Sequence, residues 1–271
     1  MVSAQYVAFY PDLPHPRTTI VKILEHLCLS YEAKLGLGAM CAFKWRDTTI
    51  YHLDESVRLK FPAILFINGR CADISKVTIA RIYAEIFGWE LSVNPLNFSG
   101  MMVCKSDRNA AHDGQVVQGP LAVTSPGKTY SILIDNSHQG EIIDYRVPVF
   151  GGVIPFVYIK RRPIEERFSN RNSSVALSDT TQLFAPNECE LIKAFAKALG
   201  MDFGELDVLR DNRTGRLSIV DASNTPFGPP NGLSSDDSDL AITLLSKAFR
   251  EAFLPHLGQS SELGARAERC Q

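Results

Sequence analysis

The sequence predicts an α+β protein in which two lobes follow a shortened N-terminal α/β segment. The chain has 271 residues, a length that suits two lobes around a cleft. Strand-like apolar runs follow one another through the middle of the chain, and two helix patterns accompany the last of them. We expect the first segment over residues 1–72, a small lobe over 73–139, a large lobe over 140–257 and a flexible tail over 258–271.

The composition excludes several classes of function. Hydrophobic residues make up 45% and charged residues 21% of the chain, as in an ordinary soluble globular protein. The net charge of −2 supplies no overall field towards nucleic acid or an acidic membrane, and no apolar run reaches the roughly 18 residues of a membrane span. The six cysteines form no CxxC pair, which disfavours a zinc site or a disulfide framework. Since the chain also begins without a signal-peptide pattern, we expect a cytoplasmic protein that binds neither nucleic acid nor membranes.

The first third of the chain contains one helix pattern and two strand patterns. Residues 18–29 carry an apolar stripe at helical spacing. Residues 39–45 and 63–68 are apolar enough for strands, and the second run is continuous enough to be buried on both faces.

A well-marked helix follows Ser75. The Ser75 hydroxyl can cap its N-terminus, and Gly88 ends the pattern. Apolar residues recur between them at helical spacing, and we expect Val77 to be part of the buried stripe. A short strand over residues 90–93 should come next.

A lysine at the end of a strand is the first candidate binding residue. The apolar run 101–106 carries Lys105 near its end, and the polar loop 107–114 separates it from a second strand over 115–117. A lysine that faces a flexible polar loop is a plausible arrangement for neutralising a phosphate. The alternative is a surface lysine beside an ordinary hairpin loop.

A basic cluster follows two further strand patterns. Residues 130–134 form one apolar strand, and residues 144–150 and 154–159 pair as a hairpin across two glycines. Residues 160–171 then contain five cations, interleaved with amides and hydroxyls. This cluster can bind phosphates through guanidinium contacts, or it is a solvated basic patch or an RNA contact. Phe168 is its one aromatic residue, which is thin for a base-stacking platform.

Two helix patterns belong to the last part of the chain. Asn187 and Glu190 fit a capping box, and Gly200 ends the helix that follows them. The final helix is expected from about residue 239 to residue 253.

A β-hairpin between these helices carries the most informative pair of residues. Gly215 can adopt the positive φ that its short loop needs. If the turn centres near Thr214, Asp207 and Asp221 lie directly opposite each other, where like charges are destabilising. Either a shared proton or a bound cation must offset the repulsion, and we favour the cation. By the alternation of strand residues, the two acids share a face with three apolar residues: Leu209, Leu217 and Ile219.

Taken in order, these motifs resemble the ATP-grasp superfamily. The resemblance covers roughly residues 73–230 and is greatest for the branch of ribosomal-protein glutamate ligases, with D-alanine–D-alanine ligase and glutathione synthetase more distant. It implies the ATP-grasp fold, in which two α+β lobes hold ATP between them. Family members have a fuller domain before these lobes, so the first segment is shortened here.

The resemblance also implies roles for particular residues. In the family, the nucleotide phosphates are covered by a lysine at the start of a helix, a lysine on a strand and a glycine-containing loop. A linker strand binds adenine through its backbone and offers an acid to the ribose. A Phe-x-Asn motif and three cations complete the site. The implied cofactor-binding residues are Lys76, Lys105, His112, Asp113, Gly114, Ile132, Leu133, Ile134, Asp135 and Asn170, and the implied catalytic residues are Arg146, Lys160 and Arg167.

The implied metal site lies on the hairpin. In the family, a Val-Asp strand and a strand ending Glu-x-Asn-x-x-Pro-Gly hold Mg²⁺, and here Asp207 takes the first place. Asp221 replaces the usual Glu, which makes the side chain one methylene shorter. Counting back from Pro226, the family's Asn falls on Ser223, with Asn224 one residue later, so the third ligand is open between them.

The function implied by the resemblance is an ATP- and Mg²⁺-dependent ligase. Such an enzyme joins a carboxylate, activated as an acylphosphate, to an amine or thiol. Two alternatives are an ATP-grasp kinase that phosphorylates a small molecule and a non-catalytic nucleotide-binding regulatory protein. The expected partners are ATP, a small-molecule or peptide carboxylate and an amine acceptor, and a homodimer is compatible with this reading.

Overall fold

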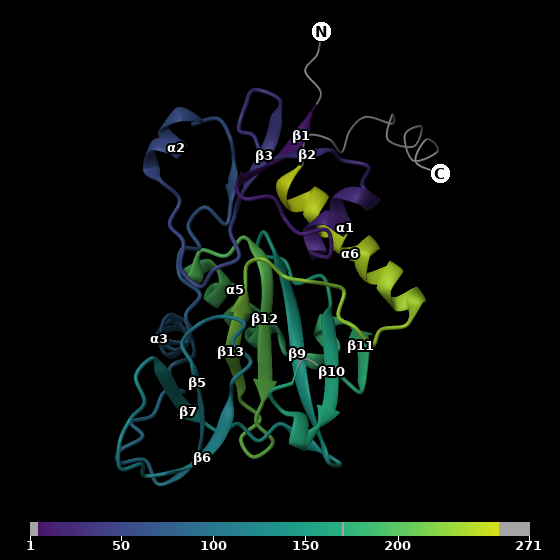
Figure 1. Ribbon diagram of the computed structural model, residues 1–271. Helices are drawn as coiled ribbons and strands as arrows, with labels where there is room; N and C mark the ends of the chain where they lie inside the picture. Colours follow the sequence, from purple (N-terminus) through teal and green to yellow (C-terminus); the bar gives the residue numbers. More distant parts are fainter. Residues whose placement is uncertain (1–4, 170, 255–271) are drawn as a thin grey trace.

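Three β-sheets organise the described part of the chain, and each uses a separate part of the sequence (Figure 1). The computed structural model describes residues 5–169 and 171–254. The first sheet has the strand order β2-β1-β3-β4, the small sheet β6-β5-β7, and the large sheet β11-β10-β9-β12-β13 with β8 paired to β9. The predicted boundaries of the lobes stay predictions.

The elements of the first half are β1 (Tyr6–Pro11), α1 (Thr19–His26), β2 (Tyr31–Glu32), β3 (Ala39–Trp45), α2 (Glu55–Lys60), β4 (Phe66–Ile67), α3 (Lys76–Phe87), β5 (Gly100–Ser106), β6 (Gln115–Gly119) and β7 (Lys128–Ile132). Those of the second half are β8 (Ser137–His138), β9 (Glu141–Phe150), β10 (Val157–Pro163), a 3₁₀ turn (Ile164–Glu166), β11 (Ser174–Ser178), α4 (Thr180–Leu183), α5 (Pro186–Leu199), β12 (Phe203–Arg210), β13 (Leu217–Ser223) and α6 (Ser235–Phe253).

The first sheet is parallel, and its strand β3 covers the predicted range. The predicted strand over 63–68 is wrong in length, because only Phe66 and Ile67 join the sheet. Turns border it on both sides, since Ile64 N–H donates to Phe61 O at 3.1 Å and Cys71 N–H donates to Asn68 O at 3.1 Å.

Helix α3 has the predicted ends. Ser75 Oγ accepts a hydrogen bond from Thr78 N–H at 3.3 Å, and Gly88 adopts φ 78° at the C-terminus. Val77, however, is exposed, because the buried face of the helix is formed by Ile79, Ile82 and Tyr83, at helical spacing from one another. The strand predicted over 90–93 is reduced to a single bridge between Ser92 and Ser131.

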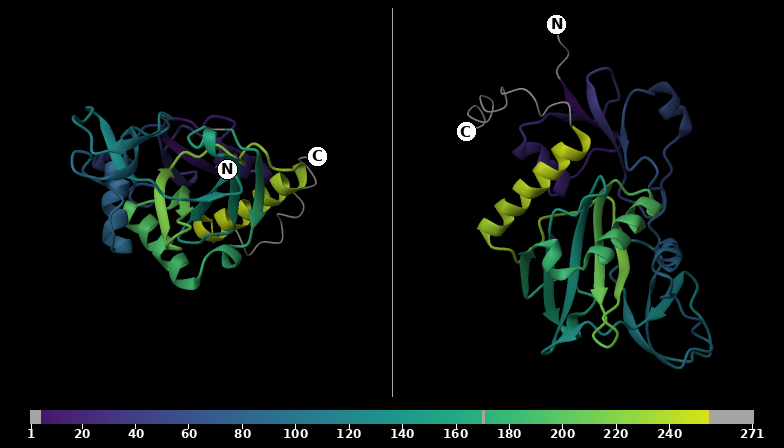
Figure 2. Two further views of the ribbon diagram at one scale, coloured as in Figure 1. Left: turned by 90° about the horizontal axis from the view of Figure 1, so that it is seen from below. Right: turned by 180° about the vertical axis from the view of Figure 1, so that it is seen from behind.

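The large sheet is antiparallel, and helices α3 and α5 pack behind it (Figure 2). Pro186 is the first residue of α5, and Glu188 Oε2 accepts from Ala185 N–H at 2.9 Å. The capping box predicted at Asn187 and Glu190 is therefore wrong by two residues, since proline is favoured at the first helical position. Gly200 ends the helix as predicted.

Helix α6 joins the first sheet to the large sheet. It starts at Ser235, four residues before the predicted start, and Ser234 caps it. Its buried residues Leu245 and Phe249 share one apolar core with residues of α1, of the first sheet and of the upper ends of β9, β10 and β12 (Figure 1). The predicted tail lies outside the described residues.

Two further expectations concern the setting of the protein. Within the described ranges, no helix combines the length and apolar character needed to cross a bilayer. Of the described cysteines, Cys41 and Cys71 are buried, whereas Cys104 and Cys189 are partly buried and Cys28 is exposed.

Candidate active site

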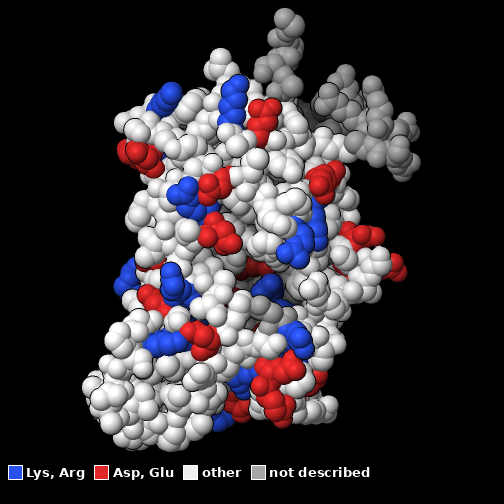
Figure 3. Space-filling view, in the orientation of Figure 1, with Lys and Arg blue, Asp and Glu red and all other residues white. Residues whose placement is uncertain are grey.

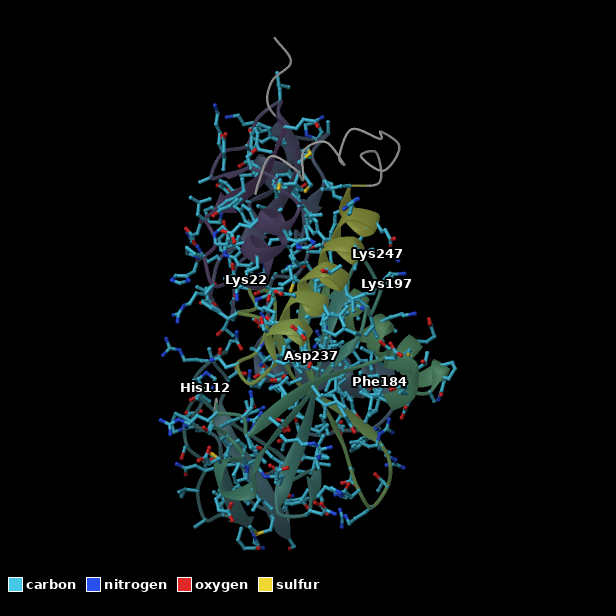
Figure 4. All side chains as sticks on the ribbon, turned by 90° about the vertical axis from the view of Figure 1, so that its right-hand side faces the viewer. Lys22, His112, Phe184, Lys197, Asp237 and Lys247 are labelled. Atoms are coloured by element: carbon cyan, nitrogen blue, oxygen red, sulfur yellow. The ribbon has the colours of Figure 1, made fainter. Side chains whose placement is uncertain are left out.

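A cavity of about 600 Å³ lies between the small sheet and the open face of the large sheet. This volume is within the range of about 300–1,000 Å³ that is usual for ligand sites. Figure 3 shows this side of the molecule, with charged side chains gathered around a hollow in its middle. Lys22 and His112, which line the cavity, lie on one side of the large sheet, whereas Phe184 and Lys197 lie on the other (Figure 4).

The hairpin of β12 and β13 has the predicted register at its two acids. Asp207 pairs with Asp221, and Gly215 adopts φ 69° in the connecting loop. Beyond this pair the register shifts, because Val208 pairs with Ile219, so that Val220 forms a β-bulge.

The bulge corrects the predicted composition of the hairpin face. One extra residue reverses the alternation of β13, so Leu217 and Ile219 are buried in the core against α5. Leu209 alone of the three predicted apolar residues shares the cavity with Asp207 and Asp221.

The repulsion between the two aspartates is offset by the protein's own cations. Asp207 Oδ1 accepts from Lys160 Nζ at 3.1 Å and from Arg146 Nε at 3.2 Å, and Asp221 Oδ1 accepts from the buried Lys76 Nζ at 2.5 Å. Although burial opposes it, the nearby charges of Lys160 and Arg146 hold the pKa of Asp207 below its ordinary range. Each of the two aspartates therefore has at least one cation of its own beside it, which offsets their repulsion in the protein without a ligand.

The donor set of the hairpin fits Mg²⁺. Hydrogen bonds from described residues to Asp207 and Asp221 all reach Oδ1, which leaves Oδ2 of each carboxylate for another ligand. No group of three or more acidic, histidine or cysteine side chains in the described part of the chain is arranged to hold a metal. Mg²⁺ does not need one, because it usually binds through one or two carboxylates, waters and substrate phosphates.

The two candidates for the third metal ligand have different positions. Ser223 lines the cavity beside Asp221. Asn224 is buried outside it, and its Nδ2 donates to Cys71 Sγ at 3.7 Å. Of the two, the structure brings Ser223 and not Asn224 to the aspartates.

Lysines from the small-sheet side reach across to the hairpin. Lys105 Nζ donates to Val220 O at 2.9 Å, the carbonyl of the bulge residue. Burial lowers the pKa of Lys105. Both predicted lysines, Lys76 and Lys105, therefore line the cavity near Asp221.

The loop 107–114 closes one side of the cavity. Asp113 accepts from Ser106 N–H at 2.9 Å and pairs with Lys128, which lowers the pKa of Asp113. Gly114 packs against the ring of Phe168, where a Cβ atom would come within 2.5 Å of Cδ1. Any other residue here would displace the Phe168 ring, so glycine favours this close approach between the loop and the large-sheet side. His112, with φ 48°, also lines the cavity.

The predicted linker strand lies along the cavity, except for its acid. Ile132, Leu133 and Ile134 line the cavity, and Arg167 Nη1 donates to Ile134 O at 3.3 Å. The structure does not bring Asp135 into it, because its carboxylate accepts from Ser137 Oγ at 2.6 Å. Asn170 lies outside the described residues.

Several cavity residues were not assigned a site role from the sequence, although the first of them, Asp144, belongs to an Asp-x-Arg motif of the family resemblance. Asp144 accepts from Arg162 Nη2 at 2.7 Å, and burial raises the pKa of Asp144. Arg17 and Lys22 come from the segment before and within α1, far from any recognised motif. No sequence pattern marks them, because only the fold places α1 beside the large sheet.

Glu205 is the most consequential of the missed residues. It precedes Asp207 by two positions, so strand alternation could have placed it on the same face. Its side chain is 2% exposed, and Arg146 Nε lies 3.5 Å from Oε2. Burial, reinforced by the charge of Asp207, raises the pKa of Glu205 to about 7, against the opposing effect of Arg146.

Comparison with known proteins identifies the fold. No protein-family model and no curated protein sequence matches the chain. Solved structures do match. The ATP-grasp ligase PsnB, in complex with a phosphomimetic variant of its minimal precursor, Mg and ADP, is similar with a TM-score of 0.58 at 11% identity, over 92% of this chain and 98% of that one.

D-alanine–D-alanine ligase from Bacillus anthracis is similar with a TM-score of 0.56 at 12% identity, over 93% of this chain and 98% of the ligase. Its complex with ATP has a TM-score of 0.54 at 13% identity, over 93% and 98% of the two chains. The chain therefore has the ATP-grasp fold, as the sequence predicted. Its resemblance to one branch of the superfamily stays a prediction.

Proposed function

We propose that this protein is an ATP- and Mg²⁺-dependent ligase that joins a carboxylate to an amine or thiol through an acylphosphate. The observation that carries the proposal is the convergence on one cavity of two opposed aspartates and cations from several elements. Those cations are Lys76, Lys105, Arg146, Lys160, Arg162 and Arg167. A triphosphate needs positive charge from several directions, and this arrangement supplies it.

The solved structures support the same function. The similar PsnB structure contains Mg and ADP, and a similar D-alanine–D-alanine ligase structure contains ATP. In the present chain, Asp207 and Asp221 would hold Mg²⁺, with Ser223 as the nearest further oxygen. Bound there, the metal would neutralise charge on the phosphate oxygens.

The cavity residues have separate tasks in the first step. A substrate carboxylate oxygen attacks the γ-phosphorus of ATP, the bond to the β-phosphate oxygen breaks, and ADP leaves with the electron pair. Arg146 and Lys160 are placed to bind the transferring phosphoryl group, because Asp207 holds both side chains at the centre of the large sheet. Lys76 and Lys105 are placed to bind the remaining phosphates from the small-sheet side.

In the second step, the acceptor attacks the acyl carbon of the acylphosphate. The acyl–oxygen bond breaks, and phosphate leaves and takes up the proton that the acceptor loses. No nucleophile of the protein takes part, so the task of the chain is to orient two substrates and exclude water.

Nucleotide binding is the first test. ATP with Mg²⁺ should raise the unfolding temperature in a thermal-shift measurement, since a ligand at 100 times its Kd stabilises the folded state by about 2.7 kcal/mol. The Asp207→Asn variant, normalised to its own unfolding temperature without ligand, should show a smaller shift. Wild-type protein that shows no shift up to millimolar ATP would overturn the proposal.

The product distinguishes a ligase from its alternatives. A screen that supplies carboxylates and amines separately and together should yield ADP only with both, and phosphate in equal amount. ADP formed together with a stable phosphorylated alcohol would identify a kinase instead. Nucleotide binding without turnover in any combination would identify a non-catalytic nucleotide-binding protein.

A further inference from the structure

The residues that line the cavity carry more positive than negative charge. They include nine lysines and arginines and five aspartates and glutamates. Each of the five carboxylates already forms an ion pair with a lysine or arginine of the protein. The surplus of positive charge is therefore not needed to balance the protein's own acids, and it favours anionic ligands.

Three of the nine cations have no partner in the described part of the chain. The side chains of Arg17, Lys22 and Arg108 form neither an ion pair nor a hydrogen bond with a described residue. Arg108 belongs to the loop 107–114, which closes one side of the cavity. Arg17 and Lys22 come from the N-terminal segment, and the proposed binding of ATP assigns no role to them.

The predicted linker strand marks one end of the cavity. Arg167 Nη1 donates to Ile134 O at 3.3 Å, and Arg167 O accepts from Arg162 Nη1 at 3.3 Å. Arg162 Nη2 in turn donates to Asp144 Oδ2 at 2.7 Å. These contacts tie the strand to Asp144 on β9, which lies roughly 7 Å from Arg146, two residues further along.

Helix α1 marks the other end. Glu205 pairs with Pro148, which lies two residues beyond Arg146 and away from the linker strand. A Cβ atom on Gly228 would lie 3.6 Å from Glu205 Oε1 and 2.6 Å from Thr19 Oγ1, so α1 begins beside Glu205. The centre where the phosphates are proposed to bind therefore lies between the linker strand and α1.

Arg17 and Lys22 flank the start of α1. Arg17 precedes Thr18, which bridges to Phe227, and Lys22 lies one turn later, where its N–H donates to Thr18 O at 3.4 Å. Both side chains line the cavity. Figure 4 shows Lys22 on the side of the first sheet and His112, from the loop 107–114, on the side of the small sheet. The two cations thus face the cavity from beyond its centre.

Neither side chain has a structural task among the described residues. Arg17 is exposed and Lys22 is half-buried, so water can solvate both in the protein without a ligand. The nearest acid at this end does not neutralise them, because the side chain of Glu205 is 2% exposed and lies against Arg146. Unpaired cations that face a ligand cavity are suited to bind a carboxylate through charge-assisted hydrogen bonds.

We propose that Arg17 and Lys22 bind a second carboxylate of the acid substrate, whose first carboxylate is phosphorylated. The acid substrate is therefore a dicarboxylate. The inference rests on the proposed ligase function and names the class of its acid substrate. The first carboxylate meets the γ-phosphate of ATP near Arg146 and Lys160, and the rest of the molecule extends past Glu205 towards α1.

Binding of matched acids tests this inference without turnover. Succinate, glutarate and adipate have the chain lengths of butyrate, pentanoate and hexanoate, and each adds a second carboxylate. Ligand-observed NMR titrations are made on protein saturated with Mg²⁺ and a non-hydrolysable ATP analogue. At least one diacid should bind roughly tenfold or more tightly than its matched monoacid. The preference should weaken in Arg17→Gln and in Lys22→Gln and disappear in the double variant.

The double variant of Lys197→Gln and Lys247→Gln is the matched control. It removes two exposed charges from α5 and α6 that do not line the cavity, and the preference for the diacid should be unchanged (Figure 4). Equal binding of every diacid and its monoacid to wild-type protein would overturn the proposal. A preference that survives in the double variant of Arg17 and Lys22 would do the same. So would its loss in the control, because net charge would then be the cause.

Affinity for the ATP analogue separates the two cations from the nucleotide site. Measured by isothermal titration calorimetry with Mg²⁺, it should be unchanged in the double variant of Arg17 and Lys22 and lower in Lys105→Ala. An equal loss in both would assign Arg17 and Lys22 to the nucleotide phosphates and overturn the proposal. Failure of the analogue to bind wild-type protein would instead contradict the proposed function, so the two failures are distinguishable.

Discussion

The two ends of the cavity differ in how their charges are partnered. Around Asp207 and Asp221, each carboxylate lies against at least one lysine or arginine. Around Glu205, two residues away, buried oxygens have no hydrogen-bond partner in the described part of the chain. At the first end the carboxylates are neutralised by the protein's own cations, and a polyanion could take their place as the partner of these lysines and arginines. At the second end the described residues leave buried oxygens without a hydrogen bond, which costs free energy in the folded state.

The largest effect is expected from removing the carboxylate at the partnered end. Asp207→Ala leaves the buried Lys160 and the partly buried Arg146 without their shared anion, and this should lower the free energy of unfolding by about 4 kcal/mol. Urea unfolding at pH 7 measures it. Asp12→Ala, which breaks a half-exposed pair with Arg46, is the control and should have a much smaller effect. Similar losses of stability in both variants would contradict a stabilising role for the ion pairs of Asp207 with Lys160 and Arg146.

Glu205→Gln should act in the opposite direction. The pKa of Glu205 is raised to about 7 from an ordinary 4.5, so between these values the folded state binds more protons than the unfolded state. The stability of the wild type therefore falls as pH rises from 4.5 to 7, and the lost stability is not regained above that range. Glutamine keeps the shape without the charge, so the variant should be more stable at pH 8 by up to about 3 kcal/mol.

Unfolding by urea at pH 4, 6 and 8 checks the sign. The advantage of Glu205→Gln should be small at pH 4, where the carboxyl is neutral in both states, and should grow towards pH 8. A difference that is independent of pH would show that the carboxylate charge is not its cause.

A smaller effect is expected at the loop that covers the phosphate end. In Gly114→Ala the new methyl meets the ring of Phe168 at 2.5 Å, and its displacement should cost about 1–2 kcal/mol. If this contact is the cause, the cost should fall to near zero when Phe168 is already alanine. A double-mutant cycle by thermal unfolding measures the coupling. An unchanged cost in the Phe168→Ala background would exclude the contact.

The smallest effect is expected for an ion pair outside both ends. Arg81 Nη1 lies 2.6 Å from Glu85 Oε1, and both side chains are more than half exposed. Arg81→Ala should change the free energy of unfolding by less than about 0.5 kcal/mol, because solvent screens such helical pairs. A loss comparable to that of Asp207→Ala would mean that burial does not decide the strength of these pairs.

Local rules in the sequence predicted much of the fold. Ser75 and Gly88 mark the ends of α3 because capping and positive φ depend on a few neighbouring atoms. The register of Asp207 against Asp221 followed from the turn alone. The bulge at Val220 did not, since no local pattern distinguishes an extra strand residue from an ordinary one.

The residues that the sequence left unrecognised depend on long-range packing. Glu205 alternates with Asp207, but the absence of a hydrogen-bond partner for it becomes visible only once Thr19 and Gly228 are placed beside it. Asp135 fits the family pattern by position, yet the nearby Ser137 takes its carboxylate. Spacing identifies which residues share a strand face, and it does not identify which neighbour satisfies each polar atom.

The carbonyl of the bulge residue Val220 also ties two sheets together. Lys105 on β5 holds this carbonyl, and Lys76 on α3 holds the adjacent Asp221, so the small-sheet side is latched to the hairpin by two ammonium groups. An anion that binds both lysines has to replace their contacts with Val220 O and Asp221. The two sheets would then be connected through the bound nucleotide, so their freedom to move relative to each other would depend on whether nucleotide is bound.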